Sequence, residues 1–266
     1  MSQSVATQPE AIVLPPTQDE LPCDDGMPME TARHRQQMTL LIETIQTWLV
    51  ARPDGYAGGN MFIHFSLEQV RNQDFRGPDF FLVLGVPKKE RKSWVVWEEG
   101  KGPDVVIELL SESTADRDKT EKKRIYQNQL RVLEYFWYDP FEPSDLAGFK
   151  LDDGAYKPLP FDNQDRLISP LLGLSLVRWQ GVFENVEAVW LRWAGLDGKL
   201  LPTEHEVAEQ IAGEARQQVS EARRLADDAA QFVQQAEQRA AAEAQRAQAA
   251  EAEIARLKAL LAKGDS

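Results

Sequence analysis

The pattern of apolar and polar positions predicts a mixed α/β domain. Apolar residues at helical spacing, among them Leu41 and Ile45, predict a helix over about residues 31–51. Short continuous apolar runs follow in FFLVLGV (80–86), SWVVWEE (93–99), DVVIELL (104–110) and LEYFWYDP (133–140), and such runs are typical of strands buried in a sheet. Between the last two strands, the basic stretch 114–130 predicts a second helix that packs back over the sheet.

Weaker patterns predict the rest of the domain. The segment NMFIHFSL (60–67) alternates like a strand, and His64 is expected to be half exposed there. From 141 to about 201, turns and short apolar runs predict a β extension that caps the domain.

After Pro202 the apolar pattern changes to that of a long helix, because Ala, Glu, Gln and Arg dominate and no proline follows. A 3,4 repeat runs from Ala208 to Leu261, and only Glu243 breaks it. The alanines of this repeat would bury little apolar surface, so the stronger apolar contacts are expected near Leu257, toward the C-terminal end of the helix. We expect a coiled coil for self-association or for a protein partner; the alternative is a lone solvated helix.

These patterns divide the 266 residues into three parts. Residues 1–26 are rich in Pro, Gln, Asp and Ser, and we expect them to be disordered or extended. Residues 27–201 form the predicted α/β domain, and residues 202–266 the long helix.

Composition indicates the cellular compartment of the protein and limits the binding partners that it is expected to have. Cys23 is the only cysteine, so a disulfide framework is excluded and a reducing cytoplasm is expected. Residues 1–22 have no basic, apolar leader, and no apolar run is long enough to span a membrane. The net charge of −13 argues against a non-specific nucleic-acid coat protein, although an enzyme with a local basic patch remains compatible with it.

The candidate chemistry centres on Glu108, which interrupts the apolar run VVIELL. A lone carboxylate in a buried strand is costly unless it is paired or bound to a metal. Asp104 lies on the same strand about 13 Å away, too far for one metal ion to bind both side chains directly. Asp79 begins a different strand, so its carboxylate can lie beside Glu108 if the two strands pair.

A cation should complete this group. Lys122 is the best placed, because Asp118, Lys122 and Tyr126 recur every four residues and share one face of the predicted helix. Two carboxylates, a divalent ion and a lysine form a site for phosphodiester hydrolysis. Three alternatives stay open: Asp79 as a turn residue, Glu108 as a buried ion-pair partner of Lys122, and Lys122 as a solvated lysine.

The order of these motifs resembles one known family. PDFFLVLG, VVIELLSEST, the spacing D-x-x-x-K-x-x-x-Y from Asp118 and the strand LEYFWYDP are together similar to the Uma-type restriction endonuclease family of the PD-(D/E)xK nuclease superfamily. The resemblance covers roughly residues 25–200. It extends upstream to Asp24, Asp25, Gly26, Glu30 and His34.

The resemblance implies a restriction-endonuclease-like mixed sheet flanked by helices and Mg²⁺-dependent (or Mn²⁺-dependent) cleavage of DNA. It implies that Asp79, Glu108 and the Leu109 carbonyl hold the metal. The usual lysine, two residues after the acid, is replaced here by Leu110, and Lys122 is the match in this family. The rival hypothesis is a weakly active or inactive nuclease-fold binding module on a coiled-coil arm.

Basic side chains surround the candidate site in the sequence. They either contact DNA phosphates or belong to solvated loops. The set is Lys88, Lys89, Arg91, Lys92, Lys101, Arg117, Lys119, Lys123 and Arg124.

Overall fold

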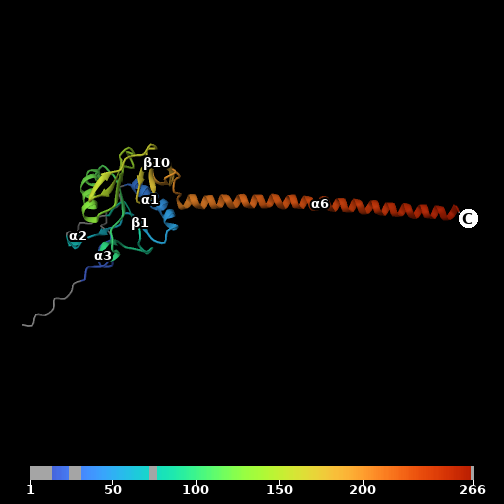
Figure 1. Cartoon of the computed structure of the whole chain (residues 1–266), viewed down its shortest axis with the longest axis horizontal. Helices are drawn as coiled ribbons and strands as arrows, with labels where there is room; N and C mark the ends of the chain where they lie inside the picture. The colour runs from blue at the N-terminus through green and yellow to red at the C-terminus, as the bar shows by residue number, and fades with distance from the viewer. Residues whose placement is uncertain (1–13, 24–30, 72–76, 265–266) are drawn as a thin grey trace, which may run out of the picture. The chain divides into compact units, whose positions relative to one another are not determined.

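The structure is a computed structural model that describes residues 14–23, 31–71 and 77–264. Two compact units divide the chain, Met1–Glu204 and His205–Ser266. The first unit is a mixed α/β domain (Figure 1). The fold class predicted from the apolar pattern is therefore confirmed.

A mixed sheet forms the centre of this domain. Its strand order among the described residues is β1-β3-β5-β6-β7-β8. The pairs β1–β3, β3–β5, β6–β7 and β7–β8 are antiparallel, whereas β5 and β6 are parallel. The strands are β1 (Tyr56–Gly58), β3 (Phe80–Val83), β5 (Val105–Leu109), β6 (Glu134–Tyr138), β7 (Leu146–Asp152) and β8 (Ala155–Pro158).

One face of the central sheet packs against α1 (Ala32–Val50) and a second sheet. That sheet has the order β11-β10-β9, with β9 (Leu167–Ser169), β10 (Leu174–Phe183) and β11 (Val186–Gly195). Its Trp193 packs in the same core cluster as Ile45 and Ile107. Gln37 also joins α1 to β11, because its side-chain amide exchanges hydrogen bonds of 2.8 and 2.9 Å with the Leu191 main chain. The β extension predicted from 141 to about 201 is therefore confirmed only in its later part, because β7 and β8 join the central sheet instead.

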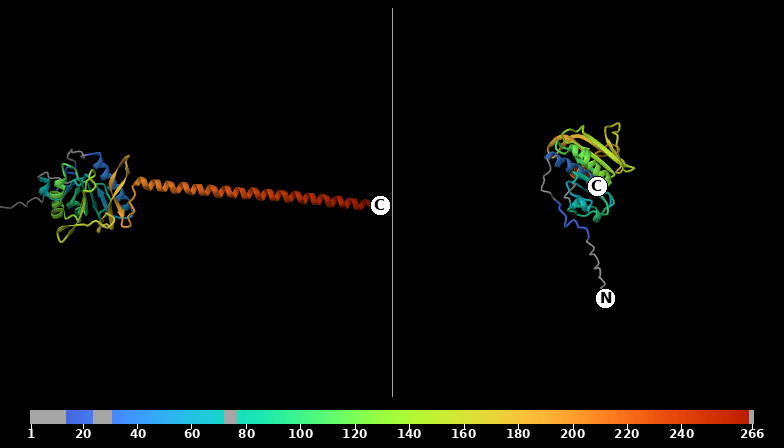
Figure 2. Two further views of the ribbon diagram at one scale, coloured as in Figure 1. Left: turned by 90° about the horizontal axis from the view of Figure 1, so that it is seen from above. Right: turned by 90° about the vertical axis from the view of Figure 1, so that its left-hand side faces the viewer.

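A helical segment covers the opposite face (green in Figure 2). It comprises α4 (Ala115–Arg117), η1 (Asp118–Lys122), α5 (Lys123–Ile125) and η2 (Tyr126–Leu130), and the two η elements are π-helical. The sequence predicted a continuous helix here, so its extent is confirmed but its regular α geometry is wrong. A π turn adds one residue to a helical turn without ending the helix, and no glycine or proline marks it in the sequence.

A small parallel pair lies beside the main sheet, formed by β2 (Ile63–His64) and β4 (Trp94–Val95). The short helices α2 (Leu67–Arg71) and α3 (Val96–Glu99) follow these strands. The strand predicted over 93–99 is therefore wrong in its second half. Gly100 ends α3. It adopts a left-handed conformation, and its N–H donates to the Val96 carbonyl.

His64 is fully buried, which corrects the prediction of a half-exposed side chain. Its Nε2 donates to the Pro22 carbonyl across 3.0 Å. The Trp97 indole N–H donates to the Pro16 carbonyl of the same N-terminal segment. Part of the segment expected to be disordered or extended thus packs over β2 and α3, and it is this packing that covers His64.

The second unit is the helix α6 (Glu204–Gly264). The predicted long helix is confirmed. Its larger apolar side chains are exposed where the structure describes them, including Val219, Phe232, Val233 and Ile254. Among the described residues no helix is long and apolar enough to cross a membrane.

Candidate functional site

The candidate site begins with Glu108 on β5. Alternation along this strand turns Ile107 toward α1 and Val106 toward the helical segment 115–130, and Glu108 shares the second side. The Glu108 side chain is fully buried. Its Oε1 accepts a hydrogen bond of 2.7 Å from the Tyr126 hydroxyl, and its Oε2 lies 3.1 Å from the Lys122 ammonium. The buried acid therefore has the partners that its position requires.

Strand pairing brings Asp79 to the same place. Phe80 pairs with Ile107 in the antiparallel β3–β5 ladder, so Asp79, one residue earlier, lies beside Glu108. Asp79 Oδ2 accepts a hydrogen bond of 2.7 Å from the Leu109 main-chain N–H. The Asp79 carboxylate is thereby fixed at the carboxyl end of β5.

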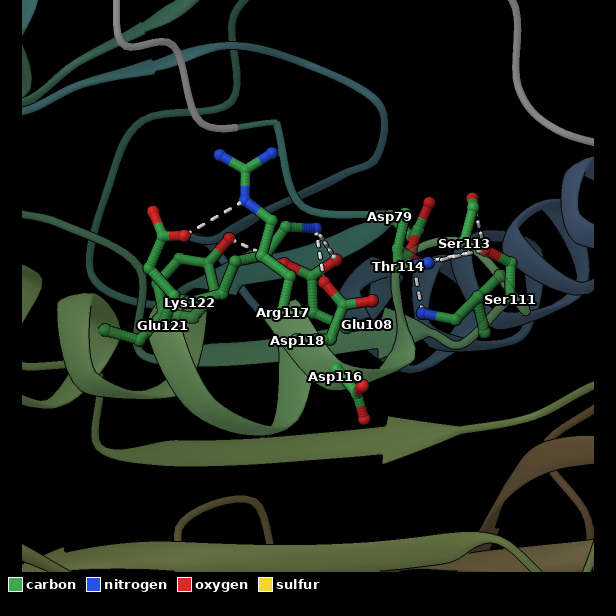
Figure 3. Close-up of polar contacts among 12 residues, drawn as sticks. Asp79, Glu108, Ser111, Ser113, Thr114, Asp116, Arg117, Asp118, Glu121 and Lys122 are labelled. Carbon is green, nitrogen blue, oxygen red and sulfur yellow. Dashed lines mark hydrogen bonds and ion pairs between the residues drawn. The ribbon is translucent and has the colours of Figure 1, made fainter.

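Lys122 lies between two carboxylates from different elements (Figure 3). Its ammonium is 3.1 Å from Glu108 Oε2 and 2.7 Å from Asp118 Oδ1. Asp118 is 1% exposed and the Lys122 side chain 17%, so the cluster is nearly closed to solvent. One ammonium thus faces three carboxyl groups, those of Asp79, Glu108 and Asp118.

This imbalance of charge is visible in the pKa values of the cluster. Burial raises the pKa of Glu108 to about 7, and the charge of Asp79 adds to the rise. Burial also raises the pKa of Asp79 and of Asp118 to about 6 each. Burial alone would lower the pKa of Lys122, but the surrounding carboxylates outweigh it and raise that pKa above its usual value.

The raised pKa values predict that the metal-free domain loses stability as pH rises from about 4 to 8. Because the folded state holds protons on Asp79, Asp118 and Glu108 that the unfolded chain has released, the free energy of unfolding falls through this range. Urea denaturation at several pH values with EDTA measures the slope. The Glu108→Gln variant removes the group with the highest of these three values and should show a shallower slope; an unchanged slope would contradict the assignment.

The donor set fits a hard divalent cation. Mg²⁺ prefers oxygen ligands and is often held by one or two carboxylates, with water completing its coordination. Asp79 and Glu108 supply two adjacent carboxylates at a place with excess negative charge, and the Leu109 carbonyl follows Glu108 directly. Among the described residues no three acidic, histidine or cysteine side chains converge as a metal-binding group. A metal here would therefore take two side-chain carboxylates, with main-chain and water oxygens.

Comparison with known proteins identifies the family. A family model described as "Putative restriction endonuclease" (Uma2) matches residues 25–180, more than half of the chain. The chain belongs to the Uma2 family. No curated protein matched it. Among solved structures, a "putative nuclease belonging to DUF820" from Anabaena variabilis matches with 16% identity and a TM-score of 0.42, covering 59% of this chain and 91% of that chain.

In this Uma2 protein the three predicted catalytic residues lie together, and Leu109 adjoins them through its N–H to Asp79. The side chain of Leu110, at the usual lysine position, is buried and apolar. Of the upstream motif, Asp24, Asp25, Gly26 and Glu30 lie outside the described residues.

His34 of the same motif is described and buried. Its Nε2 donates to the Leu110 carbonyl across 2.9 Å, and its Nδ1 lies 2.8 Å from the Thr31 hydroxyl. His34 thus contacts the chain just beyond the candidate metal ligands.

Two further residues of the Uma2 site were not among the predicted catalytic groups. Asp118 pairs with Lys122, and Tyr126 donates to Glu108. The four-residue spacing of Asp118, Lys122 and Tyr126 was the signal that could have assigned all three. The hydroxyl of Tyr126 orients the catalytic candidate Glu108.

Structural contacts engage most of the basic side chains that surround the candidate site in the sequence. Asp104 pairs with Lys101 and accepts a hydrogen bond of 2.7 Å from the Leu84 N–H, so it has a structural role just before β5. Lys123 lies over the Phe149 ring. Ion pairs with acidic side chains engage Lys89, Arg91, Lys92, Lys101, Arg117 and Lys119. These contacts favour structural roles for the basic residues over a continuous phosphate-binding surface.

Proposed function

We propose that this chain is an endonuclease that hydrolyses phosphodiester bonds of DNA with a divalent cation, Mg²⁺ or Mn²⁺. The cation would be held by Asp79, Glu108 and the Leu109 carbonyl. The observation that supports this most is the convergence of Asp79, Glu108 and Lys122 from a strand, its antiparallel neighbour and the helical segment above them. Membership of a family described as restriction endonucleases supports DNA as the substrate.

Each group of the site would have its own role in phosphodiester hydrolysis. The bound cation would supply Lewis acidity and stabilise the negative charge that develops on the phosphate oxygens. Lys122 would add a positive charge to the same phosphate, or orient the attacking water. Asp118 would stay paired with the Lys122 ammonium when Glu108 binds the cation. Tyr126 would orient the Glu108 carboxylate through its hydrogen bond.

Plasmid nicking tests this proposal. Supercoiled plasmid should be converted to open-circular and linear forms with Mg²⁺ or Mn²⁺, and EDTA should stop the reaction. Calorimetric titration of the metal into the protein should detect a site that is lost in Asp79→Asn. Absence of both cleavage and metal binding with either ion would contradict the proposal.

One observation favours a binding module without catalysis. Lys122 is engaged by two carboxylates, and Leu110 stands where the superfamily usually has its lysine. Under this second function, the protein would bind DNA or a protein partner but leave plasmid intact with both metals. The plasmid assay therefore separates the two functions.

We further propose that α6 mediates self-association through the seam that contains Val233 and Ile254. Both side chains are more than half exposed, as expected for a seam awaiting a partner helix. Replacing either with glutamate should lower the oligomeric mass measured by sedimentation equilibrium. The controls Gln231→Glu and Ala252→Glu place the same charge outside the repeat, and equal effects in all four variants would contradict the seam.

A further inference from the structure

An exposed aromatic ring follows β6, at the end of the sheet where β5 also ends. Phe141 is 61% exposed, although phenylalanine is among the residue types most often found buried. The loop around it is held in place, because Asp139 Oδ1 accepts hydrogen bonds of 2.8 and 3.0 Å from the N–H groups of Phe141 and Glu142. The ring is therefore presented to solvent by a fixed turn.

A cation supports this ring from α1. The Arg33 guanidinium carbon lies 5.6 Å from the Phe141 ring centroid and 4.9 Å from that of Trp190. In the part of the chain that the structure describes, no carboxylate forms an ion pair with Arg33. The His34 ring also lies near Phe141, with 5.8 Å between the ring centroids. Phe141 and Arg33 together offer an aromatic face and a positive charge.

Strand pairing places Phe141 at the same end of the sheet as the candidate site, on the side of α1. The parallel strands β5 and β6 end together, since Leu109 pairs with Tyr138 and the Leu110 N–H donates to the Tyr138 carbonyl across 2.8 Å. Phe141 comes three residues after Tyr138. His34 links the two places, because it contacts Phe141 and donates to the Leu110 carbonyl.

We propose that Phe141, supported by Arg33, is a stacking subsite for an unpaired nucleobase of the DNA strand that enters the site. This inference rests on the proposed endonuclease function. Every nucleobase has an aromatic face that can stack on a phenylalanine, and a neighbouring arginine adds attraction to the base and its phosphate. Such a subsite holds a strand beside the cleavage site without selecting its sequence.

Binding of a fluorescent single-stranded oligonucleotide, measured by anisotropy in EDTA to prevent cleavage, tests the subsite. Phe141→Ala should weaken binding about tenfold, the size expected for the loss of one stacked base. Phe141→Trp should bind at least as tightly as the wild type. The matched control is Leu133→Ala, which removes an exposed apolar side chain at the opposite end of β6; its affinity should equal that of the wild type.

An oligonucleotide with abasic sites separates stacking from other effects. Without bases to stack, the wild type and Phe141→Ala should bind it equally. An equal loss on normal and abasic strands would overturn the subsite, as would unchanged affinity of Phe141→Ala or no binding by the wild type. Glu108-dependent cleavage with unchanged affinity in Phe141→Ala would overturn the subsite alone. Phe141-dependent binding without Glu108-dependent cleavage would instead overturn the nuclease function and leave the subsite standing.

Discussion

The Glu108→Gln variant is expected to cut plasmid DNA at least about 100-fold more slowly than the wild type, a loss typical for removing one electrostatic catalytic group. The amide keeps the shape of the side chain and can still accept the hydrogen bond from Tyr126, but it no longer carries the charge that would bind a divalent cation. The variant should also remain folded, because it replaces a buried carboxyl whose pKa is raised to about 7. Gel assays of nicking rate and thermal denaturation in EDTA measure the two effects separately.

Glu134 provides a matched control for this variant. It is a buried acid on the neighbouring strand β6, and burial raises its pKa too. Its carboxylate instead accepts hydrogen bonds from the Ser169 hydroxyl and from the Leu171 N–H. Glu134→Gln should therefore leave the nicking rate of the folded protein unchanged. Equal rates for Glu108→Gln and the wild type would exclude Glu108 from the reaction.

The sequence predicted the components of this cluster because each follows from a simple geometric rule. An acid in a continuous apolar strand requires a partner, and the distance along an extended strand excludes Asp104 as the second metal ligand. Antiparallel pairing of β3 with β5 then brings in Asp79, as expected if the two strands were neighbours. Helical spacing places Lys122 and Tyr126 on one face above Glu108.

Other features depend on tertiary contacts that no local pattern records. The second half of the segment 93–99 has the composition of a strand, yet it forms α3, whose Trp97 indole bonds to the Pro16 carbonyl. His64 has the alternation of a half-exposed strand residue, and an N-terminal segment some forty residues earlier covers it. The π turns at Asp118–Lys122 and Tyr126–Leu130 carry no glycine or proline, so the apolar pattern predicts a helix there but not its π geometry.

The buried carboxyl groups around Lys122 are expected to lower the stability of the metal-free domain. Burial, together with the repulsion among the three carboxyl groups that share one ammonium, raises the pKa of Asp79, Asp118 and Glu108, so these groups hold protons in the metal-free protein. A divalent cation would replace those protons with a fixed positive charge. If the proposed cation binds there, the stability lost in the metal-free protein is the expected cost of that function.

The second large effect is expected for Lys122→Met, which removes the ammonium that contacts both Glu108 and Asp118. Breaking a buried ion pair by deleting one partner typically costs about 3–5 kcal/mol, because the remaining charge is left uncompensated. Cleavage should fall as well, by about 100-fold, since the positive charge proposed to face the phosphate is lost. Lys122→Arg keeps the charge and should recover most of the stability.

The pH dependence distinguishes this mechanism from a simple loss of packing. Without the ammonium, the pKa values of Glu108 and Asp118 rise further in the folded state, so the variant binds protons more strongly when folded. Its stability deficit relative to the wild type should therefore be small near pH 5 and grow as pH rises to 8. Urea denaturation across this range measures the deficit.

Lys119→Met is the matched control for both readouts. Lys119 lies on the same helical turn, but its ion pair with Asp145 is about one-third exposed, and such surface pairs contribute about 0–1 kcal/mol. Its stability deficit should be small and independent of pH. A deficit in Lys122→Met that stays constant between pH 5 and 8 would show that Lys122 contributes packing rather than charge. The proposed roles of Asp118 and Glu108 as its ionised partners would then be wrong as well, because an ammonium that neutralises buried carboxylates cannot be removed without raising their pKa values.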